Sequence, residues 1–210
     1  MRARITFAKT EPMRYTGHLD LHRTWERTLR RANLPLAYSQ GFKPHPRIVL
    51  ACALPLGCTS RQEVVDIWLD EQIAAEQIKD SIQVAAPPGL EILNVTEADS
   101  DLPALPTQVQ ASEYQITLRD PIPDLDEALH RVLTAGALPR VWRDKAYDLR
   151  PLIFQIERLE EDEDGCQQIK VILSAKEAST GRPEEVLRAL GVEPGEARIQ
   201  RTRLIFEAVG

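Results

Sequence analysis

The feature that most constrains the fold is a series of strand and helix patterns that occurs twice along the 210 residues. Strand patterns alternate apolar and polar residues, whereas helix patterns repeat apolar residues every three or four positions. The first series runs strand, helix, strand, strand, helix, strand, at residues 4–10, 17–32, 47–57, 63–71, 74–85 and 90–95, with a short extended segment at 34–38. The second series has the same order, at residues 113–118, 125–136, 151–161, 166–175, 182–191 and 197–208, with an extended segment at 138–142.

Residues 99–111 separate the two series and contain two prolines but no sustained period. Such a segment is typical of a linker between domains. We therefore expect an α+β fold of two tandem ferredoxin-like (βαββαβ) units, each an antiparallel sheet with two helices on one face. The expected boundaries are residues 1–98 for the first unit, 99–111 for the linker and 112–210 for the second unit.

Positive charge is concentrated at the start of a chain whose net charge is −6. Residues 1–58 contain 10 Lys and Arg against 3 Asp and Glu, a net +7, whereas residues 59–210 contain 16 against 29, a net −13. An anionic partner such as a nucleic acid is therefore expected at the first unit rather than over the whole chain.

The composition also limits where the protein is expected to work. No apolar run approaches the ~18 residues that a membrane-spanning helix needs, and the first residues have a strand pattern rather than that of a signal peptide. Cys52, Cys58 and Cys166 form no CxxC pair, and their odd number argues against a disulfide framework. We expect a soluble cytoplasmic protein without a membrane partner and with reduced thiols.

The predicted helix at 17–32 has two different faces. Leu21, Trp25, Leu29 and Ala32 recur at helical spacing on one of them, and the other carries four arginines, Arg23, Arg27, Arg30 and Arg31. A solvated helix face explains such a stripe, and so does an anion-binding surface. The surrounding residues favour the second explanation, because they add further basic groups and flat rings: Arg2, Arg4, Lys9, Arg14, Lys43 and Arg47, with Tyr15, Tyr38 and Phe42. Basic groups interleaved with rings suit a phosphate backbone with unstacked bases.

Histidines mark the ends of the same region. His18, Asp20 and His22 form an HxDxH pattern, and His45 lies in the loop SQGFKPHP at 39–46. A metal site is disfavoured because no second acidic cluster lies nearby and Asp20 suits the positive end of the helix, so we expect neither a metal nor a cofactor. Gly41 allows the backbone of the loop to approach a ligand, although a plain rigid turn is the alternative. If the loop folds back along the unit, Arg14, Tyr15, His18, Ser39, Lys43 and His45 converge on one cleft.

Two loops of the second half place an arginine directly before a proline, Arg150 and Arg182. Each can bind an anion at a helix start, but pairing with the acidic surplus of this half is the favoured interpretation.

The run from Arg14 to Gly57 resembles a bacterial family known as radical-SAM-linked proteins, whose function is uncharacterised. The family pattern falls here on Arg14, Tyr15, His18, Leu19, Asp20, Arg23, Glu26, Arg27, Arg30, Arg31, Pro35, Ser39, Gly41, Phe42, Pro44, His45, Pro46 and Gly57. The later segments YDLRP at 147–151 and GRPEEVLRALG at 181–191 are similar too, so the resemblance covers nearly the whole chain. Gly17 and Lys43 depart from it, since the family has Ser and Asn there. The resemblance implies a radical SAM protein as partner, fused to such a chain or encoded beside it.

The expected function follows from these features together. The chain lacks the CxxxCxxC pattern that holds the cluster of a radical SAM enzyme, so we expect an accessory module that recognises a substrate for such a partner and is not catalytic alone. RNA, or an RNA-bound particle, is the expected ligand. The expected ligand-binding residues are Arg14, Tyr15, His18, Arg23, Arg27, Arg30, Arg31, Tyr38, Ser39, Gly41, Phe42, Lys43 and His45. Two alternatives stay open: a metal-independent endoribonuclease-like enzyme that uses His18, His45 or Tyr15, and a purely structural adaptor.

Overall fold

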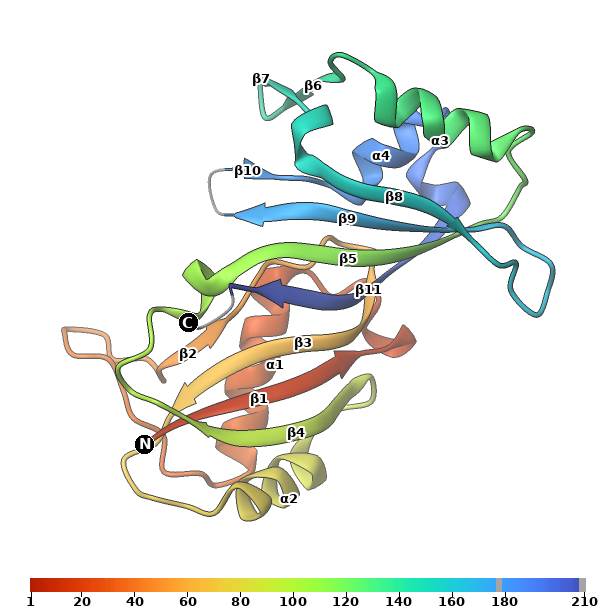
Figure 1. Ribbon diagram of the computed structural model, residues 1–210. Helices are drawn as coiled ribbons and strands as arrows, with labels where there is room; N and C mark the ends of the chain where they lie inside the picture. The colour runs from red at the N-terminus through yellow and green to blue at the C-terminus, as the bar shows by residue number, and fades with distance from the viewer. Residues whose placement is uncertain (177–178, 208–210) are drawn as a thin grey trace. The chain divides into compact units, whose positions relative to one another are not determined.

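The chain divides into two compact units, Met1–Val109 and Gln110–Gly210. Figure 1 shows the computed structural model, which describes residues 1–176 and 179–207. It confirms a mixed α+β protein whose strand pairs β1–β3, β1–β4, β2–β3, β5–β9 and β8–β9 are all antiparallel. The last residue of the predicted closing strand, Ala208, lies outside the described residues.

The first unit has the element order β, α, β, β, α, β. Its elements are β1 (Arg2–Lys9), α1 (His18–Arg31), β2 (Ile48–Leu50), β3 (Thr59–Trp68), α2 (Ala75–Ala85) and β4 (Leu90–Ala98), with 3₁₀ helices η1 (Glu11–Met13) and η2 (Leu105–Gln108). The strands lie side by side in the order β4, β1, β3, β2. The second strand is shorter than the predicted 47–57, and the segment 34–38 forms only single bridges, Leu36 with Leu69 and Tyr38 with Pro46.

The core of the first unit lies between its sheet and its helices. Ile5 and Phe7 of β1 alternate inward, and Trp25 of α1 and Ile78 of α2 pack into the same cluster. Phe7 and Trp25 meet edge to face, with ring centroids 4.9 Å apart. Since α1 and α2 share one core, both cover the same face of the sheet, and the solvent side of α1 is free to carry charge.

The opposite face of this sheet holds a buried charge cluster. Arg2 and Arg4 alternate with the core residues of β1, and both bind the carboxylate of Asp66 on β3, at 2.6 and 2.8 Å. Arg2 also donates to the carbonyls of Leu102 and Pro103, at 2.9 and 3.2 Å. The segment 99–111 is therefore held against the sheet at its start, and it continues as η2 and the beginning of β5.

The second unit repeats the order and adds a hairpin. Its elements are β5 (Val109–Leu118), α3 (Leu125–Thr134), β6 (Pro139–Trp142), β7 (Lys145–Asp148), η3 (Arg150–Leu152), β8 (Ile153–Leu159), β9 (Gln168–Lys176), β10 (Ser179–Thr180), α4 (Pro183–Ala189), η4 (Pro194–Glu196) and β11 (Ala197–Phe206). The strand β9 lies between β5 and β8, and β11 lies on the other side of β5. The hairpin β6–β7 turns at Arg143 and Asp144, whose φ angles are +48° and +64°.

Candidate functional site

Three of the basic residues expected on the surface of the first unit have internal roles instead. Arg2 and Arg4 bind Asp66 on the sheet face away from the helices. Lys9 is fully buried, and its Nζ donates to the carbonyls of Arg14 and Thr16, at 3.2 and 2.9 Å. The expectation that these residues add charge to the arginines of α1 is therefore wrong, because they hold the sheet and the segment before α1 together.

Arg14 is a predicted ligand-binding residue that also serves the backbone. Its Nε donates to the carbonyl of Gly57 at 2.9 Å, and its guanidinium lies 5.5 Å from the centre of the Tyr15 ring. Tyr15 is exposed, and His18 is the first residue of α1 and is half-buried. These three residues lie around the start of α1.

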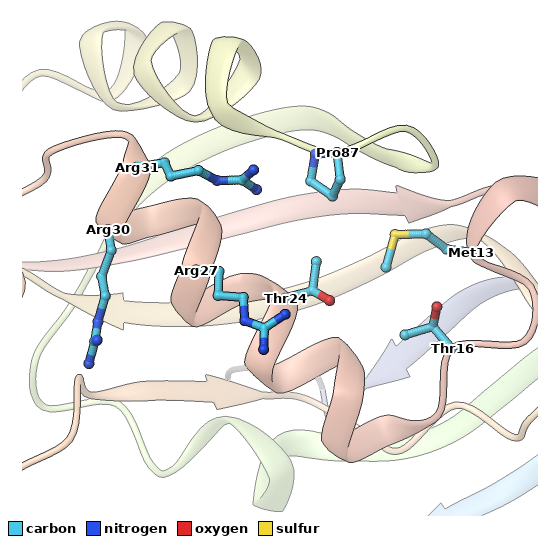
Figure 2. A pocket seen from close by; sticks show the side chains of 7 residues that line it. All are labelled: Met13, Thr16, Thr24, Arg27, Arg30, Arg31 and Pro87. Atoms are coloured by element: carbon cyan, nitrogen blue, oxygen red, sulfur yellow. The ribbon is translucent and has the colours of Figure 1, made fainter.

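A groove runs along the solvent side of α1 and is closed by the segment that follows α2. Figure 2 shows Arg31 extending from α1 toward Pro87, whereas Arg30 points away from Pro87. The volume of the groove is about 590 Å³. We call it the arginine groove, and it is lined by Met13, Thr16, Thr24, Arg27, Arg30, Arg31 and Pro87.

The arginines of α1 are not equivalent. Arg23 pairs with Asp20 at 3.2 Å and Arg30 with Glu26 at 2.7 Å, and all four partners belong to α1. Arg27 and Arg31 form no ion pair with a described residue, although both are exposed. They are four residues apart, so they lie on one side of the helix, one turn from each other. Two guanidinium groups without an ion-pair partner among the described residues thus face the arginine groove, whose described lining has no carboxylate. Arg31 also lines a neighbouring hollow, to whose lining the acidic residue Asp80 contributes.

A second hollow, about 530 Å³ in volume, lies between the first half of α1 and the loop before β2. We call it the histidine cleft; its lining includes His22, Arg23, Glu26, Ser39, His45 and Arg47. Ser39 Oγ accepts the backbone N–H of His45 at 3.1 Å, which fixes the loop at its base. The guanidinium of Arg47 lies 4.5 Å from the centre of the Trp68 ring.

The predicted single cleft does not form as expected. Of the six residues that were expected to converge, only Ser39 and His45 line the histidine cleft, and Arg14, Tyr15, His18 and Lys43 are outside its described lining. The histidine of α1 that joins His45 is His22, one turn further along, whose Nε2 lies 3.3 Å from the carbonyl oxygen of Ile48. The residues of α1 that line the histidine cleft are Leu19, His22, Arg23 and Glu26, which follow one face of the helix, and His18 is not among them.

The tip of the loop projects into solvent. Gly41 adopts φ +130°, a conformation that side chains rarely allow, and Phe42 and Lys43 next to it are exposed. Tyr38 is partly exposed at the base of the loop. Flat and basic side chains are therefore accessible here, beside the histidine cleft rather than inside it.

The two loop arginines of the second unit differ from each other. Arg150 is used by the backbone, since its Nε donates to the carbonyl of Leu133 at 2.8 Å and its Nη1 to that of Ile153 at 3.0 Å. Arg182 instead stacks on Trp142 at 3.9 Å and forms no ion pair with a described residue, so the acidic pairing expected for both is wrong.

Two features are absent from the described residues. The described residues contain no group of three or more His, Cys, Asp or Glu side chains arranged to hold a metal ion. No helix in residues 1–176 or 179–207 is long and apolar enough to cross a membrane.

Sequence reasoning missed several residues that shape these hollows. Met13 and Pro87 of the arginine groove come from segments far from α1 in the sequence, and no local pattern connects them. His22 had a usable signal, because a histidine four residues after His18 lies on the same helix face one turn closer to the loop.

The comparison with protein families decides the relationship of the chain. The model of a family described as uncharacterized protein conserved in bacteria (DUF2344) matches residues 2–183. The chain belongs to this family. No curated protein gives a significant match, so the DUF2344 assignment comes from the family model alone.

One solved structure resembles this DUF2344 chain in fold, and two others match it more weakly. The structure of a Cbf5–Nop10–Gar1 complex matches with a TM-score of 0.51 and 12% identity, over 96% of this chain and 48% of that chain. An H/ACA RNP bound to a substrate RNA containing 2′-deoxyuridine matches with a TM-score of 0.44 and 12% identity, over 88% of this chain and 43% of that chain. An unknown protein from Galdieria sulphuraria matches with a TM-score of 0.28 and 14% identity, over 97% and 98% of the two chains. The chain spans about half the length of the first two structures, and the first likeness shows the fold alone.

Proposed function

We propose that the first unit binds RNA through the arginine groove, as an accessory module that presents a substrate to a radical SAM partner. The observation that carries the proposal is the pair Arg27 and Arg31, two exposed guanidinium groups one turn apart without an acidic partner among the described residues. An uncompensated arginine pair has donors that fit phosphate oxygens, and a groove without a carboxylate does not repel them.

The rings around the loop favour RNA over a simple anion. Phe42 is fully exposed at the loop tip, and Tyr15 and Tyr38 are accessible on the same unit. Proteins that bind single strands combine basic grooves with such rings, because unstacked bases pack on them. Met13 and Pro87 add an apolar wall to the groove itself, on which the apolar face of a ribose or base can pack.

The radical SAM partner rests on the resemblance of the run from Arg14 to Gly57 to radical-SAM-linked proteins. A chain without the CxxxCxxC pattern suits the recognition role and leaves the radical chemistry to the partner. Co-expression with a radical SAM protein encoded beside the chain, followed by size-exclusion chromatography, tests this part. Separate elution of the two proteins at micromolar concentration, with and without RNA, contradicts it.

Fluorescence anisotropy with a labelled single-stranded RNA tests the RNA part. We expect binding at low salt that weakens steeply as salt rises, because each phosphate contact adds about 0.7 to 0.9 to the slope of log K against log salt. Charge reversal by Arg27→Glu and Arg31→Glu should abolish most of this binding. The matched control is Arg131→Glu on α3, an exposed arginine that pairs with Glu127 as Arg30 pairs with Glu26. The proposal is refuted if the variant with Arg27→Glu and Arg31→Glu binds RNA as tightly as the Arg131→Glu variant, or if the wild type does not bind RNA at low salt. Either result favours the structural adaptor.

A second candidate is a metal-independent endoribonuclease-like enzyme in the histidine cleft. The observation in its favour is that His22 and His45 line one hollow together with Arg23 and Arg47. Two imidazoles can serve as general acid and base, and the arginines can hold a phosphate. Cleavage of RNA in the presence of EDTA, lost in both His22→Ala and His45→Ala, would establish this activity. Intact RNA after long incubation with the wild-type chain removes the candidate.

We also propose that both units are ferredoxin-like and that the boundary between them falls within residues 99–111. The strand orders β4, β1, β3, β2 and β11, β5, β9, β8 support the classification, since each follows the same sequence of elements. An experimental structure in which β2 or β8 leaves its place beside the neighbouring strand contradicts it.

A further inference from the structure

The second unit contains a pocket that the proposed RNA surface does not use. It lies beside the hairpin β6–β7 and the short strand β10, and its volume is about 320 Å³. That volume is within the range of small-molecule sites, and larger than a lone inorganic anion needs. The residues that matter for its chemistry are Trp142, Lys145, Tyr147, Asp148, Ser179 and Arg182.

Arg182 is the central cation of this pocket. Its guanidinium carbon lies 3.9 Å from the centre of the Trp142 ring, which is close stacking for a cation and an indole. The stacked face is occupied by the ring, but the edge of the guanidinium keeps its N–H donors. Arg182 makes no ion pair with a described residue, so no carboxylate neutralises its charge, and the N–H donors that do not face Tyr147 can bind an anion.

Tyr147 supplies a neutral donor next to Arg182. Its hydroxyl oxygen is buried, and the donor next to it is the guanidinium of Arg182, which leaves the O–H proton without an acceptor among the described residues. Burial raises the pKa of Tyr147, as does the negative charge of Glu185, while the nearby Arg182 opposes the shift. The hydroxyl therefore keeps its proton at neutral pH and can donate it to an oxygen that enters the pocket.

The acidic residue of the lining, Asp148, already accepts hydrogen bonds from backbone N–H groups. Asp148 Oδ1 accepts the N–H groups of Leu138 and Arg150, at 2.7 and 2.9 Å. Its carboxylate thus compensates two backbone donors, and the cations Arg182 and Lys145 outnumber it in the lining. Glu185, whose charge reaches Tyr147, is outside the lining and is paired with Arg140 and Arg188. The lining itself therefore keeps a positive balance, which favours an anionic ligand.

We propose that this pocket binds a nucleotide, with the phosphate on Arg182, Lys145 and the Tyr147 hydroxyl and the heterocycle against the aromatic wall of Trp142 and Tyr147. Ser179 adds a hydroxyl at the same rim. The nucleotide is a free mononucleotide or the phosphorylated end of an RNA chain, which present the same chemistry. This site is independent of the arginine groove, so either proposal can fail alone.

Isothermal titration calorimetry on the full chain tests the proposal, with UMP, AMP, uridine and inorganic phosphate as separate ligands. We expect a mononucleotide to bind more tightly than uridine or phosphate, because only the mononucleotide fills both parts of the pocket. Arg182→Gln and Tyr147→Phe should each weaken it by about tenfold or more, the usual effect of losing a donor to a charged group. Arg131→Gln on α3 is the matched control and should leave the affinity unchanged, and circular dichroism verifies that each variant is folded.

The same titration with a short 5′-phosphorylated RNA separates the two sources. If the oligonucleotide binds through Arg182 and Tyr147 and the mononucleotides do not, the ligand is a chain end. The proposal is overturned if no nucleotide binds in either form. It is equally overturned if folded Tyr147→Phe and Arg182→Gln variants bind like the wild type. An effect of Arg27→Glu and Arg31→Glu on RNA alone, with UMP binding intact, would show that the two sites are separate.

Discussion

The two units share an order of elements but use arginine differently. In the first unit Arg2 and Arg4 form ion pairs with the buried Asp66. Arg27 and Arg31 are exposed and have no ion-pair partner among the described residues. In the second unit Arg182 stacks on a ring, and the arginines that form ion pairs with nearby carboxylates include Arg131, Arg140, Arg158, Arg188 and Arg203. An arginine thus adds net positive charge to the surface only where no neighbouring carboxylate pairs with it.

Total charge hides this difference. Residues 1–109 contain 12 Lys and Arg against 13 Asp and Glu, so the first unit as a whole is at net −1 despite the +7 of its first 58 residues. Residues 110–210 contain 14 against 19, a net −5. The surplus that counts for an anion is the local one in the arginine groove, where Arg27 and Arg31 have no ion-pair partner among the described residues and no carboxylate belongs to the described lining.

The largest expected effect comes from breaking the buried cluster of the first unit. Asp66→Asn leaves Arg2 and Arg4 without their counter-charge, and Arg2 is almost fully buried. Removing one partner of a buried ion pair costs about 3–5 kcal/mol, because the remaining charge stays buried. Urea unfolding in a Trp142→Phe background, followed by the fluorescence of Trp25 and Trp68, measures the change in the free energy of unfolding of this unit.

The exposed pair Asp20 and Arg23 is the matched control for that experiment. Both side chains are about two-thirds exposed, at 66% and 67%. Asp20→Asn should cost at most about 1 kcal/mol, from a surface ion pair and a charge near the start of α1. Equal costs for Asp66→Asn and Asp20→Asn would show that the buried cluster has no special role.

A smaller loss of stability is expected at the far wall of the arginine groove. Gly89 has φ +91°, and an added Cβ would lie 2.9 Å from the backbone nitrogen of Met13. Gly89→Ala should therefore cost roughly 2 kcal/mol or more and displace Met13 in the groove. Gly136→Ala is the control, since nothing lies near its Cβ position. Thermal unfolding of the two variants gives the comparison, and an unchanged midpoint for Gly89→Ala contradicts the described packing.

A neutral substitution compares the helices α1 and α3 directly. Arg27→Gln should reduce the salt slope of RNA binding by about 0.7 to 0.9, the loss of one phosphate contact. Arg131→Gln on α3 should not change it, because Arg131 is paired with Glu127 in the acidic unit. Binding isotherms at several salt concentrations give both slopes, and identical slopes for the two variants would place the RNA elsewhere.

The smallest expected effect is a loss of stability of the second unit at low pH. The N–H donors of Leu138 and Arg150 lower the pKa of Asp148 below its ordinary value. The stability that Asp148 contributes is therefore complete above the unfolded pKa of about 3.9 and is lost as pH falls through the lower folded pKa. Carboxyl NMR should show a midpoint below about 3.9, with faster amide exchange in β6 and β7 at lower pH. Asp148→Asn should exchange at a rate that no longer depends on this titration.

Local sequence patterns predicted part of the fold, whereas the rest depends on contacts between residues far apart in the sequence. The helix predicted at 17–32 is found at His18–Arg31, because its apolar spacing is regular and Gly17 precedes it. The hairpin β6–β7 escaped prediction, since Arg143 and Asp144 take positive φ angles without the glycine that marks such turns. The α+β class and the arginines of α1 could be inferred from spacing alone.

The candidate site shows the same limit. Nothing near Arg2 or Arg4 indicates that Asp66, more than 60 residues later, removes their charge from the surface. The histidine that lines the cleft with His45 could not be predicted, because the helical spacing allowed either His18 or His22. The structure places His22 in the lining. The kinds of residue in the candidate site could be predicted from the sequence. The residues that each of them contacts could be known only from the folded sheet.

The position of β1 has a consequence for how the chain is made. Within the first unit β1 is synthesised before every other strand, yet it lies between β3 and β4. On the ribosome β1 can complete its pairing with β3 only after residue 68 has emerged, and its pairing with β4 only after residue 98. Until β3 emerges both edges of β1 lack their partner strands, which makes β1 the part of the nascent first unit that most needs protection.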